Sequence, residues 1–416
     1  MSPHPQRCPA ALAFFVVYSC AGWQTYFDQF TFQEAVSRLD PGNRWGEWES
    51  EAPAERKTSP KKPCFSLISD RTIASQSSIS QSGRGRLGTC PGITIASTGS
   101  YVPDRVVTNH DLAALGCDSD WIFKRTGIRE RRKAAPGQAA SDLAYEAIQT
   151  CLKNANVAAN EVDLLVCATM TPDFLSPSTA CVLQRRLNCV APAFDLNAAC
   201  AGFMYALITA AQYVRSGMAR NALVVGTEVM SRTVDCGDIK TYPLFGDGAG
   251  VALLQPNHSN DGLGSGILSF TLGSEGNIDA LCIPGGGSRE PFTPDTLANG
   301  RQYLKMDGRA VFIWAVRVVA DSIHDVLTAA NKTAADVKLV VLHQANIRIV
   351  DAAVSSFGFP KEKVFVNVDK YGNTSAASVP LALDDANRQG LIQRGDLVLM
   401  CGFGAGLTWG TALIRW

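Results

Sequence analysis

Short apolar runs alternate with longer helical patterns from Ile93 to the end of the chain, and this alternation limits the possible folds more than any other feature. Short apolar runs are typical of strands buried on both faces, and the segment 141–154 places its apolar residues at helical spacing. The pattern predicts an α/β fold with a mainly parallel sheet covered by helices on both faces. The predicted strands span 93–98, 162–170, 193–197, 222–228, 248–254, 337–343, 364–366, 397–403 and 408–414. The predicted helices span 141–154, 178–187, 200–216, 308–330, 346–357 and 375–389.

The two halves of this region repeat the same pattern. The segment AANEVDLLVCAT (158–169) matches TAADVKLVVLHQ (333–344), because in each a helix end leads into an apolar strand that stops at a polar residue. We therefore expect two similar halves, 91–262 and 263–416, related by a pseudo-dyad. Strand ends and helix N-termini from both halves would then surround one central cleft, which is where α/β folds bind ligands.

Residues 1–90 differ from the rest in composition and lack sustained periodicity. An apolar stretch, 11–18, is too short to span a bilayer. The segment is interpreted as a disordered leader. It would be either a non-essential extension or the result of a start codon assigned too far upstream. A targeting leader and a small interaction segment remain open as alternatives.

Composition excludes several classes of function. Lys and Arg total 38 and Asp and Glu total 38, and this zero net charge argues against nucleic-acid or polybasic membrane binding. The 13 cysteines are odd in number and include no C-x-x-C, which argues against zinc ribbons and thioredoxin motifs. No H-E-x-x-H motif occurs, and no metal site is expected. We expect a reducing compartment and mostly buried thiols.

Cys200 is the candidate nucleophile. It follows a predicted strand and opens a predicted helix, and its neighbours Ala198, Ala199, Ala201 and Gly202 are small. The positive end of a helix dipole favours thiolate, and small neighbours let a substrate carbonyl approach. A buried structural thiol is the alternative.

Two further residues could act on a carbonyl. His343 ends a buried strand, where its side chain would point toward the cleft, although a core histidine is also possible. Asn373 follows Gly372 and precedes a helix rich in small residues, so its amide is either an N-cap or a donor to a developing oxyanion. The glycine clusters 246–250 and 402–406 match no phosphate-binding motif, and both are expected to be tight turns beside a strand.

Taken together, Cys200, His343 and Asn373 and the motifs around them resemble the β-ketoacyl-acyl-carrier-protein synthase III family of the thiolase superfamily. The resemblance covers 93–416 and rests on an ordered set of motifs. They are TGSYVP (98–103), DWIFKRTGIRERR (120–132), PAFDLNAACAGF (192–203), FGDGAG (245–250), HQANIRI (343–349), YGNTSAASVP (371–380) and GFGAGLTWG (402–410). It implies a five-layer αβαβα thiolase-like fold, a homodimer, a cytoplasmic location and no cofactor, since acyl-CoA is a substrate.

The resemblance also implies site roles. Cys200 would take the acyl group from acyl-CoA, and His343 and Asn373 would hold the thioester carbonyl of malonyl-acyl-carrier protein during decarboxylation. The N–H groups of Cys200 and Ala405 would form an oxyanion hole beside Phe403. The remaining roles are coenzyme A binding by Trp121, Arg125 and Asn346, carrier-protein docking by Gln344, Ala345, Asn346, Ile347 and Arg348, and an acyl-pocket gate at Ser176.

This chain departs from the family pattern at three places. Ile239 stands where the family has an arginine that grips coenzyme A. Ile313, Ser355 and Ser356 replace basic docking positions, so the basic patch for the carrier is thin. Ser176 is smaller than the aromatic residue that often limits acyl length, so primers longer than acetyl are expected.

Four functions are compared. The resemblance favours an initiating condensing enzyme of type II fatty acid biosynthesis, because elongating relatives use Cys-His-His. The alternative is an acyltransferase or ketosynthase that primes a secondary-metabolite or polyketide pathway. A papain-like Cys-His-Asn hydrolase and an inactive binding protein fit the motifs less well.

Overall fold

The structure is a computed structural model that describes residues 85–116, 118–257 and 264–416. Most of the predicted leader, 1–84, lies outside the described residues. Its last residues do not: β1 (Arg86–Pro91) pairs antiparallel with β9 (Gly266–Asn277). The boundary predicted at residue 90 therefore lies inside a strand. The sequence missed β1 because only Cys90 of this edge strand is buried, which leaves no apolar run.

Two mixed sheets form the core of the described region. The first has the order β2-β8-β7-β5-β6, and the second has β1-β9-β15-β14-β12-β13. The first consists of β2 (Ile93–Tyr101), β5 (Leu164–Ala168), β6 (Ala193–Leu196), β7 (Ala222–Val229) and β8 (Asp247–Pro256). Besides β1 and β9, the second contains β12 (Leu339–Leu342), β13 (Val364–Phe365), β14 (Leu397–Gly404) and β15 (Gly406–Arg415).

Apart from β1, the two sheets repeat one topology. In the first sheet, β8 pairs antiparallel with β2 and β7, and in the second, β15 pairs antiparallel with β9 and β14. The two remaining pairs of each sheet, at the other edge, are parallel. The matched segments 158–169 and 333–344 contain β5 and β12, which occupy equivalent places. The predicted duplication is thus confirmed. The prediction of a mainly parallel sheet is wrong, because β7–β8 and β14–β15 run antiparallel, a pairing that needs no helical crossover.

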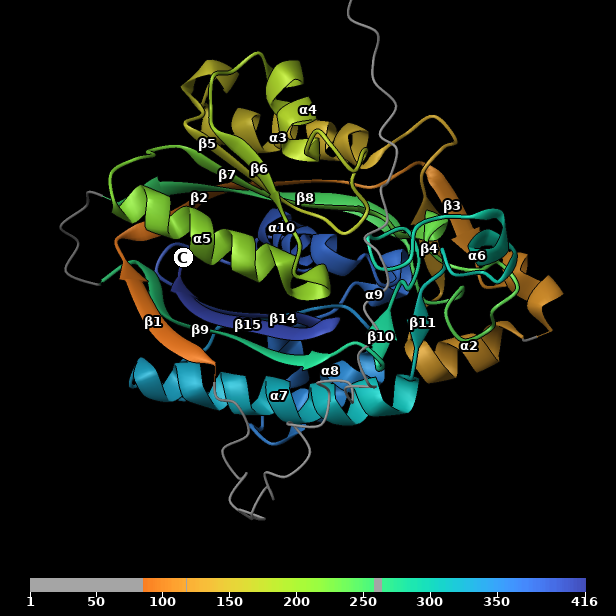
Figure 1. Ribbon diagram of the computed structural model, residues 1–416. Helices are drawn as coiled ribbons and strands as arrows, with labels where there is room; N and C mark the ends of the chain where they lie inside the picture. Colours follow the sequence, from red (N-terminus) through yellow and green to blue (C-terminus); the bar gives the residue numbers. More distant parts are fainter. Residues whose placement is uncertain (1–84, 117, 258–263) are drawn as a thin grey trace, which may run out of the picture. The chain divides into compact units, whose positions relative to one another are not determined.

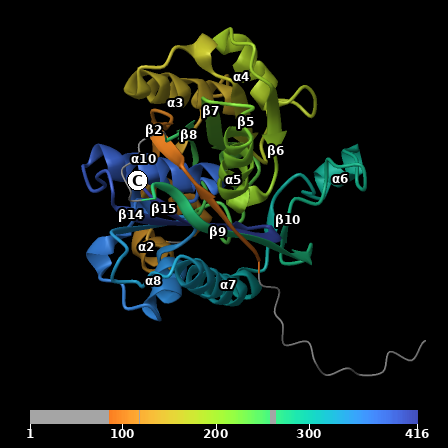
Figure 2. The ribbon, with the colours of Figure 1, turned by 90° about the vertical axis from the view of Figure 1, so that its left-hand side faces the viewer.

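Helices and sheets stack in five layers (Figure 1). One outer layer is α3 (Ala140–Ala155) and α4 (Thr179–Leu187), which pack on the first sheet. The other is α7 (Gly308–Ala329) and α8 (Ile347–Ser355), which pack on the second sheet. Between the sheets lie α5 (Gly202–Arg215) and α10 (Ser378–Arg388), and Figure 2 shows the same stacking from the side. The predicted αβαβα arrangement is confirmed.

The two central helices differ from the outer ones because both of their faces are covered by a sheet. In α5 the buried positions include Phe203, Met204 and Leu207, and small alanines let the sheets approach. Even the carboxylates of α10 are buried: Asp384 accepts hydrogen bonds from the hydroxyls of Thr98 and Ser100. A helix buried all round must be apolar or have its polar groups paired.

Shorter elements lie in the connections between these helices and strands. They are β3 (Arg105–Thr108), η1 (His110–Leu115), α2 (Ser119–Thr126), β4 (Glu130–Lys133), η2 (Ala159–Glu161), η3 (Ala199–Ala201), η4 (Met230–Arg232), β10 (Leu281–Cys282), α6 (Pro294–Ala298), β11 (Lys305–Met306), η5 (Lys361–Lys363), α9 (Val368–Tyr371) and η6 (Ser375–Ala377). The short helices η3 and η6 directly precede the two central helices, and they pack against each other. Within the described residues, no helix has the length and apolarity that crossing a membrane requires.

Candidate active site

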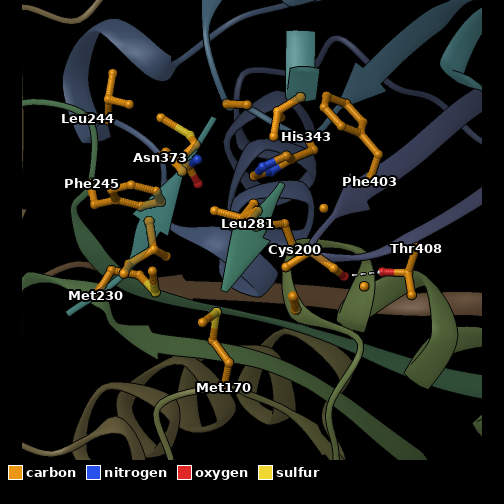
Figure 3. A pocket seen from close by; sticks show the side chains of 18 of the residues that line it. Met170, Cys200, Met230, Leu244, Phe245, Leu281, His343, Asn373, Phe403 and Thr408 are labelled. Atoms are coloured by element: carbon orange, nitrogen blue, oxygen red, sulfur yellow. Dashed lines mark hydrogen bonds between the residues drawn. The ribbon is translucent and has the colours of Figure 1, made fainter. Parts of the chain in front are cut away.

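A cavity of about 580 Å³ lies where the N-terminal ends of the central helices meet. Cys200, His343 and Asn373 all line it, and Figure 3 shows their side chains around the same space. Most of the remaining lining is apolar, contributed by residues that include Met170, Met230, Leu244, Phe245, Leu281 and Phe403. Side chains separated by more than 170 residues of sequence are thus brought to one cavity by the repeated fold.

Cys200 lies in η3 and not in the first turn of α5, where the sequence analysis expected it. The residue before it, Ala199, has a φ of 46°, which is unusual for a residue with a side chain. The N–H of Ala199 is held by the side-chain oxygen of Asn197 at 3.1 Å. This kink precedes the helix and sets the cysteine at the cavity wall.

The environment of Cys200 does not stabilise a resting thiolate. Burial raises the pKa of its thiol to about 12, and the negative charge of Glu228 adds to the rise. The hydroxyl of Ser375 opposes the shift by hydrogen bonding to the sulfur. The expected thiolate is therefore not the resting form, because removal from water outweighs the favourable partners at this site.

His343 follows β12, and its backbone N–H donates to the carbonyl of Cys401 at 2.7 Å. Its ring stands edge-on to Phe403, with centroids 5.1 Å apart. Its Nδ1 lies 2.6 Å from the hydroxyl of Ser378, which also accepts the N–H of Gln344. Among the described contacts, Nδ1 is the acceptor available to the Ser378 hydrogen, and we therefore assign the ring proton to Nε2.

Burial also decides the charge of this histidine. It lowers the pKa of His343 to about 3, so the imidazole is neutral at physiological pH. With Nδ1 occupied by Ser378, the N–H at Nε2 is the group that the ring can offer to a molecule in the cavity. His343 is consequently a neutral hydrogen-bond donor and a poor base.

Asn373 is fixed by both its backbone and its side chain. Its N–H donates to the carbonyl of Leu244 at 2.8 Å, and its carbonyl accepts the N–H of Gly246 at 3.0 Å. Its side-chain oxygen accepts the N–H of Ser375 at 2.8 Å. The amide oxygen is thereby occupied, and the amide hydrogens at Nδ2 remain for the cavity.

The loops that carry Cys200 and Asn373 repeat the same local geometry. In each, an asparagine side chain accepts the N–H two residues on, which is Ala199 in one half and Ser375 in the other. Both of these residues have a left-handed φ, 46° for Ala199 and 50° for Ser375. The duplication thus extends to the kinks before the central helices, with Cys200 equivalent in position to Ala376.

The glycine clusters lie largely in strands, which corrects their prediction as tight turns. In the first cluster, 247–250 belong to β8, and a β-carbon at Gly250 would lie 2.5 Å from the backbone nitrogen of Leu381. In the second, 402–404 belong to β14, and Ala405 alone turns the chain into β15. Strands that approach a central helix this closely require glycine.

Phe403 and Ala405 line the cavity as expected, and the Thr408 hydroxyl donates to the carbonyl of Ala198 at 3.0 Å (Figure 3).

The predicted coenzyme A residues lie on α2 and at the start of α8. The guanidinium of Arg125 lies 4.6 Å from the ring centroid of Trp121, whose side chain is partly exposed. Asn346 caps α8 through the N–H of Arg348 and donates its amide to the carbonyl of Arg125. Ile239 packs against a small apolar cluster and supplies no charge there.

The predicted docking segment divides into buried and exposed parts. Gln344 is 1% exposed, and its amide bonds to the carbonyls of Leu342 and Phe365 and to the N–H of Asn367. A docking role for Gln344 therefore does not fit, because a buried and fully bonded amide presents nothing to a partner. Ala345 and Ile347 are partly buried, whereas Arg348 is exposed.

Ser176 is exposed and does not line the cavity of its own chain. It lies between β5 and α4 beside two apolar side chains, Phe174 (56% exposed) and Leu175 (95% exposed). Nearby in the fold, β6 is an edge strand of its sheet within the described region.

Residues that the sequence analysis overlooked complete the site. Ser375 and Ser378 stand inside the quoted motif YGNTSAASVP, but only the fold shows what they contact. Glu228 is the second-last residue of a buried strand and is itself fully buried. The sequence signal for it is a carboxylate within an apolar run. Cys282 also lines the cavity.

Comparisons with known proteins agree with this geometry. Residues 194–276 match the family model described as 3-oxoacyl-[acyl-carrier-protein (ACP)] synthase III, and residues 327–416 match the model of its C-terminal part. Residues 125–234 also match the model of stage V sporulation protein AD. A β-ketoacyl-[acyl-carrier-protein] synthase III from Rhodopirellula baltica is 61% identical over 79% of this chain and its own full length.

The chain belongs to the β-ketoacyl-acyl-carrier-protein synthase III family. It is therefore an acyltransferase, the initiating condensing enzyme of fatty acid synthesis. Among solved structures, the Aquifex aeolicus synthase III superposes with a TM-score of 0.71 at 41% identity, covering 78% of this chain and 100% of that chain. A priming β-ketosynthase from the R1128 polyketide pathway also has a TM-score of 0.71, at 36% identity, covering 79% and 97%.

Within the described residues, no group of histidine, cysteine, aspartate and glutamate side chains could hold a metal ion.

Proposed function

We propose that this synthase condenses an acyl-CoA with malonyl-acyl-carrier protein through a thioester on Cys200, and that His343 and Asn373 promote the decarboxylation. The observation that carries the proposal is that a thiol and two neutral N–H donors line one largely apolar cavity. Secondary-metabolite priming is not favoured, because the Rhodopirellula baltica synthase III is 61% identical to this chain and the polyketide enzyme is 36% identical.

In the first half-reaction, the sulfur of Cys200 attacks the thioester carbonyl of acyl-CoA. A bond forms between sulfur and the acyl carbon, the bond to the coenzyme A sulfur breaks, and coenzyme A leaves as a thiolate that takes a proton. The N–H groups of Cys200 and Ala405 are proposed to stabilise the tetrahedral oxyanion. Gly404 supports this role, because its missing side chain leaves the approach to the cysteine open.

In the second half-reaction, Nε2 of His343 and Nδ2 of Asn373 donate to the thioester carbonyl of the malonyl group. Loss of carbon dioxide leaves an electron pair that is delocalised onto this oxygen as an enolate. Neutral donors suit the step because they stabilise charge that develops in the transition state and do not bind the malonyl carboxylate as a salt. The enolate carbon then attacks the acyl carbon and displaces Cys200.

The coenzyme A and carrier-protein parts of the substrates would be held outside the cavity. The stacked pair Trp121 and Arg125 supports adenine binding, since a flat exposed ring with a cation beside it favours a nucleobase. Asn346 is proposed to border the coenzyme A path, since it joins α8 to α2 and lines the cavity. Arg348, with Ala345 and Ile347 beside it, is proposed to contact the acidic carrier protein, and no cofactor is required.

A homodimer is proposed to complete the enzyme. The exposed side chains of Phe174 and Leu175 beside the free edge of β6 support it, because such apolar surfaces mark interaction sites. Ser176 would then act as a gate for the acyl pocket of the partner subunit. We also propose a cytoplasmic location.

Intact-protein mass spectrometry after mixing with several acyl-CoAs tests the proposal. We expect acylation of the wild-type protein, none in Cys200→Ser, and unchanged acylation in His343→Ala with malonyl decarboxylation lost. Full condensing activity in Cys200→Ser would refute the proposal.

A further inference from the structure

A fully buried carboxylate lies beside the cysteine, and the condensation steps above give it no role. Glu228 is the second-last residue of β7 and has no exposed surface. Its carboxylate accepts hydrogen bonds from the hydroxyls of Thr171 at 2.6 Å and Thr169 at 3.3 Å, and from the N–H of Met170 at 3.2 Å. No lysine, arginine or histidine bonds to it among the described residues, so this buried acid is held by neutral donors alone.

One of these donors connects Glu228 to the site. The hydroxyl of Ser375 donates to Oε1 of Glu228 at 3.1 Å and lies 3.6 Å from Sδ of Met170. Hydrogen bonding from the same hydroxyl lowers the pKa of the Cys200 thiol, which places it between the carboxylate and the cysteine. The backbone at Ser375 is left-handed, with a φ of 50°. A hydroxyl that donates on one side and accepts on the other can pass a proton by exchanging its own.

The other nearby base is ill suited to the cysteine. Nδ1 of His343 is occupied by Ser378 at 2.6 Å, and in the tautomer assigned above Nε2 carries the ring proton. Burial also lowers the pKa of this ring to about 3, so it does not retain a thiol proton. By contrast, burial raises the pKa of Glu228 to about 7, which suits a group that gains and loses a proton at physiological pH.

We propose that Glu228 is the proton acceptor for the Cys200 thiol, acting through the hydroxyl of Ser375, and that it stores this proton while the cysteine is acylated. The reaction part of this inference rests on the proposed function. As the sulfur attacks acyl-CoA, its proton passes to the Ser375 oxygen while the Ser375 proton passes to Oε1 of Glu228. The departing coenzyme A thiolate takes its proton from solvent.

The stored proton returns in the condensation. The enolate carbon bonds to the acyl carbon, the bond to Sγ breaks, and the cysteine leaves as a thiolate. Glu228 returns the proton through Ser375, which restores the thiol and the carboxylate. The acyl-enzyme thus contains a neutral Glu228, so no buried negative charge faces the incoming malonyl carboxylate.

The direct test is the pH dependence of Cys200 alkylation by iodoacetamide, followed on the Cys200 peptide by mass spectrometry. In the wild type we expect the rate to rise through a midpoint near the pKa of Glu228, about 7. Glu228→Gln keeps the shape of the side chain but accepts no proton. It should lose this inflection and react about tenfold or more slowly at pH 7.5. Glu146→Gln, the same change on an exposed helix position, is the matched control and should leave the profile unchanged.

Ser375→Ala tests whether the proton passes through the hydroxyl of Ser375. Alanine can adopt the backbone required there, because Ala199 does so at the equivalent position. We expect the same loss as in Glu228→Gln and no further loss in the double variant, since both changes break one path. Glu228→Asp retains a carboxyl group and should keep the inflection at a reduced rate.

Three results would overturn the inference: an unchanged profile in Glu228→Gln, a loss that is equal at every pH, or losses that multiply in the double variant. Thermal unfolding of each variant identifies a folding defect, and Ser375→Ala carries the test if Glu228→Gln does not fold. Alkylation needs no acyl-CoA, so its outcome is independent of whether the proposed condensation is correct.

Discussion

Gly404 lies directly against Cys200. A β-carbon at position 404 would lie 2.7 Å from the β-carbon of Cys200 and 3.1 Å from its sulfur. The second glycine cluster is therefore a packing requirement of the nucleophile: strand β14 passes so close to η3 that no side chain fits between them.

Gly404→Ala should consequently displace the cysteine. We expect Cys200 acylation to fall about tenfold or more and the free energy of unfolding to fall by about 1–3 kcal/mol, because overpacking forces neighbours to shift. Single-turnover acylation and urea denaturation measure the two effects. Gly276→Ala is the control, since a β-carbon there meets nothing within 4 Å. Normal acylation by Gly404→Ala would show that the loop adapts.

Asn373→Asp changes a donor into an acceptor with little change in shape. The side-chain oxygen can still accept the Ser375 N–H, but the amide hydrogens are lost and a negative charge faces the enolate. We expect malonyl decarboxylation to fall about 100-fold or more. Acylation of Cys200 should change much less, and an equal loss in both half-reactions would contradict the assigned role.

Ser378→Ala removes the group that orients the ring of His343. It also leaves the N–H of Gln344 without its present acceptor. We expect decarboxylation to slow about tenfold, which corresponds to roughly 1.4 kcal/mol, because the proton is no longer held at Nε2. Ser378→Thr keeps the hydroxyl and should restore much of the rate. The idea fails if Ser378→Ala decarboxylates at the wild-type rate.

Glu228 should make stability depend on pH in a defined direction. Burial raises its pKa from 4.5 to about 7, so the folded protein binds more protons than the unfolded chain between these values. Its contribution is therefore fully present below pH 4.5 and is lost as the pH rises through 7. Relative to wild type, the free energy of unfolding of Glu228→Gln should rise by up to about 3 kcal/mol between pH 4.5 and pH 8, because each pKa unit corresponds to about 1.36 kcal/mol. Chemical denaturation at several pH values measures this, and a constant difference would contradict it.

The acyl preference can be tested with a panel of primers. The cavity of about 580 Å³ and the small side chain of Ser176 favour chains longer than acetyl. We expect butyryl-CoA and hexanoyl-CoA to acylate Cys200 faster than acetyl-CoA does. Ser176→Phe should slow the longer primers selectively, whereas equal or worse turnover of longer primers by the wild type would refute the idea.

Much of the fold followed from local patterns. The match between 158–169 and 333–344 predicted the duplication, because buried strands and their preceding helices leave a strong apolar signature. Strand β1 and the antiparallel pairs were missed, because an exposed edge strand and the direction of pairing depend on distant partners. Gln344 was misplaced for the same reason, since only packing shows which polar residues are buried.

The candidate site also combines features that could be predicted from the sequence with features that depend on the fold. The family and the candidate reactive groups could be predicted from the chain alone, because Cys200, His343 and Asn373 lie in ordered motifs of fixed spacing. The chemical states of these groups depend on the folded environment. Burial makes His343 a neutral donor, keeps Cys200 a thiol, and brings Glu228 and Ser375 to its side. Desolvation and hydrogen bonding across the two halves set these states, and neither is encoded in the residues next along the chain.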